Sequence, residues 1–159
     1  TDVCSDPGTP ESIKRTALIW LGRIHFDAEE YDEALNCFES TVKFGGNAGA
    51  ESQFMISKIK YNLGDYDSAE SNIFTLVSDF SSYDEWKFKG FLLLVRTYIG
   101  LNDLFQARAT AESIMENVNV EWVQNACSDL MMEIEAMEGS ELNGTDLIET
   151  GTQNEVNDK

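Results

Sequence analysis

The nine residues "NLGDYDSAE" (Asn62–Glu70) decide the fold, because they separate two segments in which apolar residues recur every three or four positions. Gly64 can adopt the positive φ that ends a helix. Asp65 can accept hydrogen bonds from the first backbone N–H groups of the next helix. A turn this short forces the two helices to lie antiparallel. The small Ala69 then lets the second helix approach the first closely just past the turn.

The same turn occurs three times along the chain. The stretches "EEYDEAL" (29–35), "GDYDSAE" (64–70) and "NDLFQAR" (102–108) align at spacings of 35 and 38 residues. Each is preceded and followed by a segment with helical periodicity. The aligned small residues are Ala34, Ala69 and Ala107. Repeated helical hairpins stack so that each unit contacts its neighbours, which predicts an all-α solenoid of three hairpins.

The predicted organisation has three parts: a flexible leader over 1–9, a helical domain over 10–138 and a disordered acidic tail over 139–159. The tail has four apolar residues in 21, too few to form a core. Within the domain the repeats cover about 15–49, 50–87 and 88–119, and a capping helix follows over 119–138. Capping patterns are expected at Asp65, at Asp103 with Gln106, and at Ser82 with Glu85.

The residues around the turns carry a family resemblance. The first unit, Leu18-x-x-Leu21-Gly22-x-x-His25 and then Ala34-x-x-x-Phe38, resembles the tetratricopeptide repeat pattern. The other units read Ile56-Ser57 with Ala69-x-x-x-Ile73, and Leu94-Val95-x-x-Tyr98 with Ala107-x-x-x-Ala111. The closing proline of the pattern is absent from every copy. The resemblance implies a right-handed α-solenoid that binds proteins.

A second resemblance concerns the source of the chain. The stretches "YNLGDYDSAE", "YDEWKFKGFLLLVRTYIGLND" and "FQARAT" together resemble the C-terminal end of larger tetratricopeptide proteins of Bacteroidetes cell envelopes. This resemblance implies a longer parent chain with more repeats upstream, and a location in the periplasm or cell envelope.

The charge of the chain narrows its partners. The net charge is −18, from 29 acidic against 11 basic residues, which disfavours nucleic acid and anionic membranes. No stretch of 18 apolar residues occurs, so no membrane span is expected. Within this acidic chain Arg23, Lys58 and Arg96 share one register of the repeat, 35 and 38 residues apart, on the first helix of each hairpin.

These cations predict a binding groove. The resemblance places the first helices along the concave side of the stack, so the three cations should form a row there. Apolar and aromatic residues flank the row one turn earlier and one turn later: Ile19, Phe54 and Leu92, then Phe26 and Tyr61. Such a groove fits an extended peptide or a partner helix that carries a carboxylate. Alternatively, the cations pair with acids of the same stack, and both can hold.

The leading hypothesis is therefore a non-enzymatic scaffold for protein–protein interaction. The alternative is a structural C-terminal cap that rigidifies a longer repeat array or assembles a cell-envelope complex. Ile19 and Leu92 stand where the tetratricopeptide clamps for chaperone tails have lysines, so recognition of that kind is not expected.

The sequence offers no reactive set of residues. His25 is the single histidine, so neither a triad of the usual kind nor a multi-histidine metal site can be assembled. We expect His25 to pack inside its hairpin. Cys37 and Cys127 fall in helical segments and are expected to be small buried apolar residues, whereas Cys4 lies in the leader. We therefore expect no catalytic residue, no metal and no cofactor.

Overall fold

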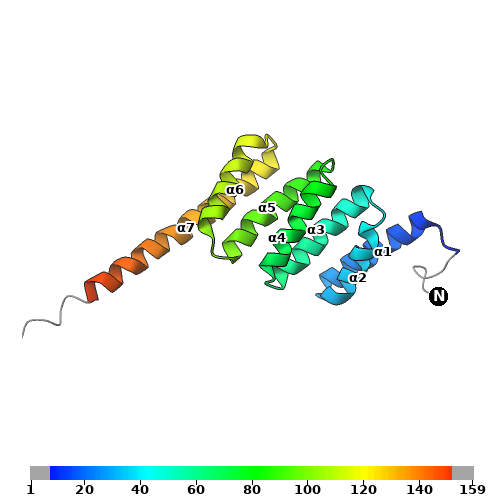
Figure 1. Cartoon of the computed structure of the whole chain (residues 1–159), viewed down its shortest axis with the longest axis horizontal. Helices are drawn as coiled ribbons and strands as arrows, with labels where there is room; N and C mark the ends of the chain where they lie inside the picture. The colour runs from blue at the N-terminus through cyan, green and yellow to red at the C-terminus, as the bar shows by residue number, and fades with distance from the viewer. Residues whose placement is uncertain (1–7, 152–159) are drawn as a thin grey trace, which may run out of the picture.

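The structure is a computed structural model that describes residues 8–151, with side chains placed as far as Ser140. In this part of the chain it has seven α-helices and no strand (Figure 1), which confirms the predicted all-α fold. The helices are α1 (Glu11–Asp27), α2 (Tyr31–Val42), α3 (Gly46–Asn62), α4 (Tyr66–Asp79), α5 (Asp84–Gly100), α6 (Leu104–Asn117) and α7 (Glu121–Gly151).

Successive helices pair into three hairpins, α1–α2, α3–α4 and α5–α6, each closed by a three-residue turn. The hairpins span residues 11–42, 46–79 and 84–117, so each begins about four residues before its predicted repeat. The difference is clearest at "KFGGNAGAE", which the sequence predicted to be a linker. Helix α3 already begins there, because Gly45 turns the chain with a φ of 64° and a Cβ at Gly49 would lie 2.8 Å from the ring of Phe80.

The three turns share one backbone conformation. Glu29, Gly64 and Asn102 occupy equivalent positions, and their φ angles are 59°, 74° and 57°. The predicted caps at two of them are confirmed: Asp65 Oδ1 accepts from the backbone N–H of Ser68 at 3.3 Å, and Asp103 Oδ1 accepts from that of Gln106 at 3.0 Å.

The cap predicted at Ser82 is wrong. Helix α5 begins at Asp84, and Tyr83 stands at its N-cap without a side-chain capping bond. The physical reason is the packing of the preceding turn. The backbone N–H of Tyr83 donates to the carbonyl of Phe80 at 3.0 Å, and the two rings stack with centroids 6.3 Å apart.

Small residues let the helices of each hairpin approach. Ala34, Ala69 and Ala107 are fully buried, as predicted. The glycine opposite the first of them has a more specific role. A Cβ at Gly22 would lie 2.7 Å from Cε1 of Phe38, so the absent side chain makes room for this aromatic ring.

Aromatic residues join neighbouring hairpins. The Tyr66 ring lies against Gly100 of the third hairpin, where a Cβ would come within 2.5 Å of it. The Tyr31 hydroxyl accepts from Asn62 at 3.2 Å. Trp86 packs on Phe54 with centroids 5.7 Å apart, as expected for a residue between the second and third units.

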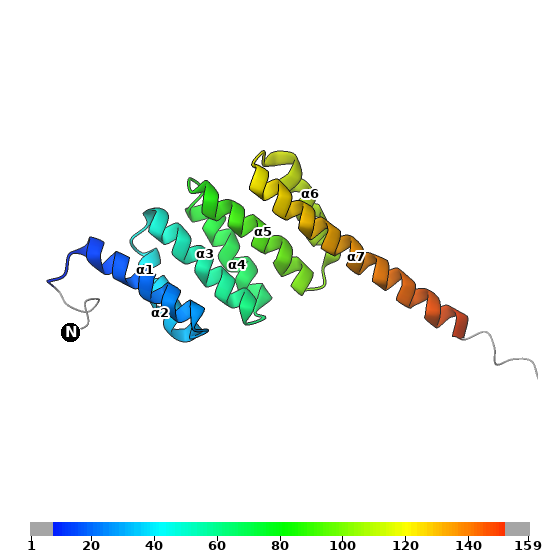
Figure 2. The same cartoon turned by 180° about the vertical axis from the view of Figure 1, so that it is seen from behind.

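The helices form two layers that differ in spacing. Each odd-numbered helix contacts the next odd-numbered one, whereas within residues 8–151 the even-numbered helices do not approach one another. Figure 2 shows α1, α3, α5 and α7 following one another on the same side. Closer spacing in one layer makes that layer the inner side of a curved stack. The hand of the curve predicted from the resemblance stays a prediction.

Helix α7 closes the stack and then extends beyond it. Val123, Cys127, Leu130 and Ile134 are at most 1% exposed and pack on α5 and α6. The helix continues to Gly151 instead of ending near residue 138, so the residues up to 151 are not disordered as predicted. Low apolar content excludes packing but not elongation, because each added residue of an existing helix gains a hydrogen bond. The leader residues 1–7 and the tail residues 152–159 lie outside the described residues.

Candidate functional site

The inner face carries three successive hollows, one at each junction between odd-numbered helices. The first, of about 320 Å³, lies between α1 and the start of α3 and includes Arg15, Ile19 and Glu51. The second, of about 190 Å³, lies between α3 and α5 and includes Phe54, Lys58 and Arg96. The third, of about 450 Å³, lies between α5 and α7 and includes Phe88, Val120 and Trp122.

Four of the predicted groove residues come together in the second hollow. Its full lining is Phe54, Lys58, Lys89, Leu92, Leu93 and Arg96. Three ammonium or guanidinium groups therefore surround one small apolar cavity on a chain of net charge −18. The burial of Leu93 and the stacking of Phe54 on Trp86 keep the apolar walls in place.

The three cations of this hollow differ in their ionic partners. Lys58 has no acidic partner within 4.0 Å among the described residues, and its Nζ lies 5.1 Å from the ring centroid of Phe26. Arg96 is half-exposed, and its closest carboxylate oxygen, on Glu133 of α7, is 4.0 Å away. At that distance between two exposed groups the Coulomb attraction is small. Both cations can therefore accept a carboxylate from outside the chain.

Lys89 was missed by the sequence reasoning. Its Nζ lies 2.7 Å from Glu85 Oε1 and 4.2 Å from the centroid of the Trp86 ring. The side chain lines both the second and the third hollow, so it connects them into one track. A signal existed in the sequence, because Lys89 precedes Arg96 by seven residues, which is two helical turns on the same face.

Arg23, predicted to extend the row, is engaged inside the stack. Its Nε donates to Glu51 Oε1 at 2.7 Å, and its guanidinium also forms an ion pair with that buried carboxylate. The guanidinium lies 5.0 Å from the ring centroid of Trp20. This contact ties α1 to α3, so the alternative of internal pairing describes Arg23. Ile19 lines the first hollow, apart from the other cations.

Phe26 and Tyr61 lie at the ends of their helices and not in the lining of a hollow. Phe26 stacks on Tyr31 with centroids 5.9 Å apart, and Tyr61 stacks on Tyr66 at 5.5 Å. Both rings are half-buried and stiffen the turns of their hairpins. Phe26 still bears on the site, because its ring faces the ammonium group of Lys58.

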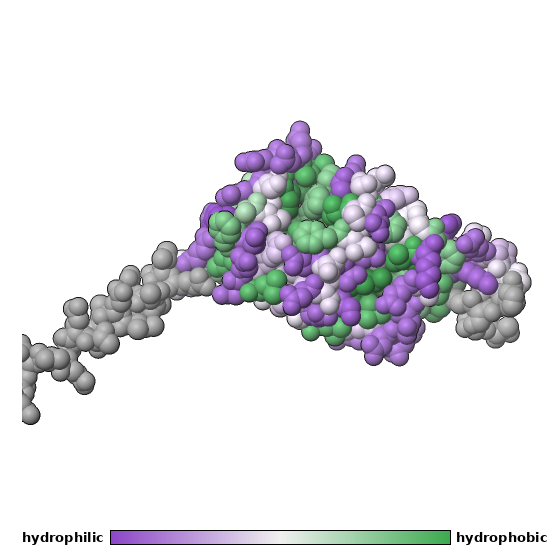
Figure 3. Space-filling view, in the orientation of Figure 1, coloured by the Kyte–Doolittle hydropathy of each residue, from purple (hydrophilic) through white to green (hydrophobic). Residues whose placement is uncertain are grey.

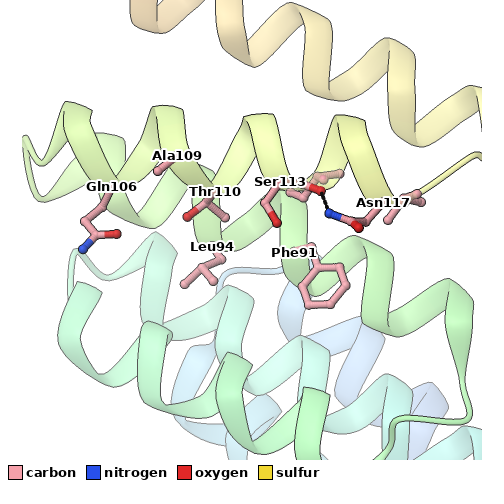
Figure 4. Close-up of a pocket in the computed structure, with 9 residues that line it drawn as sticks. Phe91, Leu94, Gln106, Ala109, Thr110, Ser113 and Asn117 are labelled. Carbon is pink, nitrogen blue, oxygen red and sulfur yellow. Dashed lines mark hydrogen bonds between the residues drawn. The ribbon is translucent and has the colours of Figure 1, made fainter.

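A larger hollow of about 470 Å³ lies on the other side of the molecule, between α5 and α6 (Figure 4). In the close-up, Thr110 and Ser113 of α6 lie across from Phe91 and Leu94 of α5. Figure 3, which views this side, shows apolar side chains gathered where α6 faces α4. The lining holds no charged group, and its polar members are hydroxyls and amides without a neighbouring base. It can bury apolar surface, but it offers less to orient a ligand than the inner face.

The remaining candidates for chemistry are occupied by structural roles. His25 Nδ1 lies 2.6 Å from Glu30 Oε2 at the first turn, with its side chain 28% exposed. Cys127 is buried, donates to the carbonyl of Ala111 at 3.2 Å, and has a raised pKa because of its burial. Among the described residues, no cluster of three or more His, Cys, Asp or Glu side chains could hold a metal ion.

No helix in the described part of the chain has a stretch of the length and apolarity needed to cross a bilayer. No protein-family model matches the chain, and no curated protein matches its sequence. The candidate site therefore stands on its own geometry: a stack of helical hairpins whose inner face carries the Lys58, Lys89 and Arg96 hollow, called here the cation hollow.

Proposed function

We propose that this chain is a non-enzymatic protein-interaction module of the tetratricopeptide kind, and that it holds an extended peptide or a partner helix along the inner face. The observation that carries the proposal is the cation hollow. Three cations surround an apolar cavity, and Lys58 has no carboxylate within 4.0 Å among the described residues. The partner would place an aspartate, a glutamate or a terminal carboxylate at these cations.

The apolar surroundings determine the rest of the partner. Phe54 and Leu92 form the walls of the cation hollow, and Trp122 lies in the adjoining hollow at the other side of Lys89. A segment with an acidic residue and an apolar side chain a few positions away can satisfy both hollows at once. Charge-assisted hydrogen bonds fix its register, and burial of its apolar side chain adds affinity.

The test is selection from a displayed library of random twelve-residue peptides, followed by affinity measurement with a labelled member of the enriched set. We expect enrichment of peptides that combine acidic with aromatic or aliphatic residues. Lys58→Glu and Arg96→Glu should each weaken binding by roughly tenfold or more, because a hydrogen bond to a charged group contributes about 1.5–3 kcal/mol. Binding should also weaken as salt rises.

Lys43→Glu is the matched control, because it makes the same change in charge at an exposed residue that does not line the cation hollow. It should leave the affinity within about twofold of the native value. Far-UV circular dichroism establishes that all variants keep their helices. Lack of enrichment, or equal affinity of the native chain and the Lys58→Glu and Arg96→Glu variants, would remove the groove proposal.

A further inference from the structure

The outer face of α1 exposes a stripe of large apolar side chains, which we call the α1 stripe. Ile13, Trp20, Leu21 and Ile24 are 51%, 57%, 38% and 60% exposed. Their spacing puts them on one side of the helix, roughly opposite the buried Gly22 that faces α2. The stripe is distinct from the inner face, where Ile19 and Arg23 lie.

The repeat shows that this face is a packing surface. By the spacings of 35 and 38 residues, Leu21 and Ile24 correspond to Ile56 and Ile59 in α3, and to Leu94 and Thr97 in α5. All four of these later residues are at most 7% exposed. In α3 the cover comes from the preceding hairpin, because Ile56 and Ile59 pack on Ala34 and Phe38. The first unit has the same apolar face without a neighbour.

We propose that the α1 stripe binds the α1 stripe of a second copy of this chain, with the two helices antiparallel about a two-fold axis. Charge selects this face for self-association. Two acidic and three basic residues lie on α1: Glu11 and Asp27, then Lys14, Arg15 and Arg23. The helix therefore carries a net charge of +1 (3 − 2) in a chain of net charge −18, and two copies repel least there.

The antiparallel arrangement also matches charges within the pair. Lys14 and Arg15 lie in the first half of α1, whereas Asp27 and the adjoining Glu29 lie at its end. Antiparallel pairing brings the basic half of each helix towards the acidic end of the other. A parallel pair would place like charges side by side.

The other end of the stack does not offer an equivalent apolar face. The outer side of α7 exposes Glu121, Asn125, Asp129, Met132 and Glu135. Burying Trp20 and Ile24 against three carboxylates would desolvate those charges without pairing them. The contact is therefore α1 with α1, which closes as a dimer and does not propagate into a filament.

The size of the contact predicts its strength. A helix of 17 residues is about 25 Å long and about 10 Å wide. Two such faces bury on the order of 1,000 Å² in total, at the lower limit of stable interfaces. We therefore expect a reversible dimer with a dissociation constant in the micromolar range.

The experiment is sedimentation velocity of the whole chain across about 2–200 µM, a range that brackets a micromolar constant. The sedimentation coefficient of the native chain should rise from the monomer to the dimer value. Ile24→Lys should remain monomeric throughout, because it places an ammonium group in the centre of the contact. Phe105→Lys is the matched control, since Phe105 is 78% exposed on α6, and it should dimerise like the native chain.

Circular dichroism separates loss of association from loss of folding, and Ile13→Lys provides a second variant in the α1 stripe. A native chain that stays monomeric at the highest concentration would overturn the proposal and leave the face to another occupant, such as a preceding hairpin. A dimer that persists in both Ile24→Lys and Ile13→Lys would overturn it as well.

Discussion

Substitution of Gly22 by alanine tests the contact that brings α1 and α2 together. The added Cβ would lie 2.7, 2.9 and 3.0 Å from three atoms of the Phe38 ring. Because Phe38 is fully buried, its ring cannot turn away without displacing its neighbours. Overpacking of this kind costs about 1–3 kcal/mol, and the better helix propensity of alanine offsets about 1 kcal/mol of it. We expect a net destabilisation of about 0–2 kcal/mol.

The sign of the effect should reverse when the ring is removed. Leucine at position 38 lacks the ring atoms that the new Cβ would meet. In the Phe38→Leu background, Gly22→Ala should therefore be neutral or stabilise the chain by up to about 1 kcal/mol, which is the propensity term alone. The coupling energy of the double-mutant cycle should be about 1–3 kcal/mol.

The assay is urea unfolding followed by far-UV circular dichroism for the native chain, the two single variants and the double variant. Linear extrapolation gives the free energy of unfolding of each. Equal costs of Gly22→Ala in the two backgrounds would refute the reasoning, since the Phe38 ring would then not be the obstacle. A clear stabilisation of the native chain by Gly22→Ala would refute it too.

Three further outcomes can be measured. Asp103→Ala removes the cap on Gln106 N–H and should cost about 1 kcal/mol, seen as a Tm lower by roughly 2–4 °C. Arg108 donates to Glu138 at 3.1 and 2.5 Å and lowers the pKa of that carboxyl. This stabilisation is present above the ordinary pKa of a glutamate and is lost as the pH falls through the lowered value. Hydrogen exchange in the packed part of α7 should therefore quicken in acid, and Arg108→Ala should remove that step. Burial and the 2.7 Å hydrogen bond to Glu70 raise the pKa of Tyr98 to about 12. The associated stability is complete below the ordinary value of 10.0 and is lost as the pH rises towards 12. An absorbance titration should show one late-ionising tyrosine that is missing in Tyr98→Phe.

The sequence predicts the local structure of this protein well because its signals are local. Apolar residues three and four positions apart place the helices. Gly64 and Asp65 mark a turn by the conformations and hydrogen bonds that these residue types favour. The 35- and 38-residue spacings then transfer the turn to its two other copies, where the structure has Glu29 and Asn102 in the same conformation.

What the sequence could not supply depends on contacts between distant side chains. Equal spacing of Arg23, Lys58 and Arg96 predicts a common register, but not that Glu51 of the next hairpin engages Arg23. Lys89 joins the cation hollow although it lies outside that register. The extent of α7 was underestimated for a different reason, because low apolar content was taken as loss of helix when it is only loss of packing.

The shared geometry of the three turns has a consequence for engineering the length of the molecule. Glu29, Gly64 and Asn102 stand at corresponding points with nearly the same φ, so a chain cut after any one of them and rejoined after another would cross a joint of familiar shape. Whole hairpins could be deleted or duplicated in this way without inventing a connector, and the molecule could be shortened or lengthened one unit at a time.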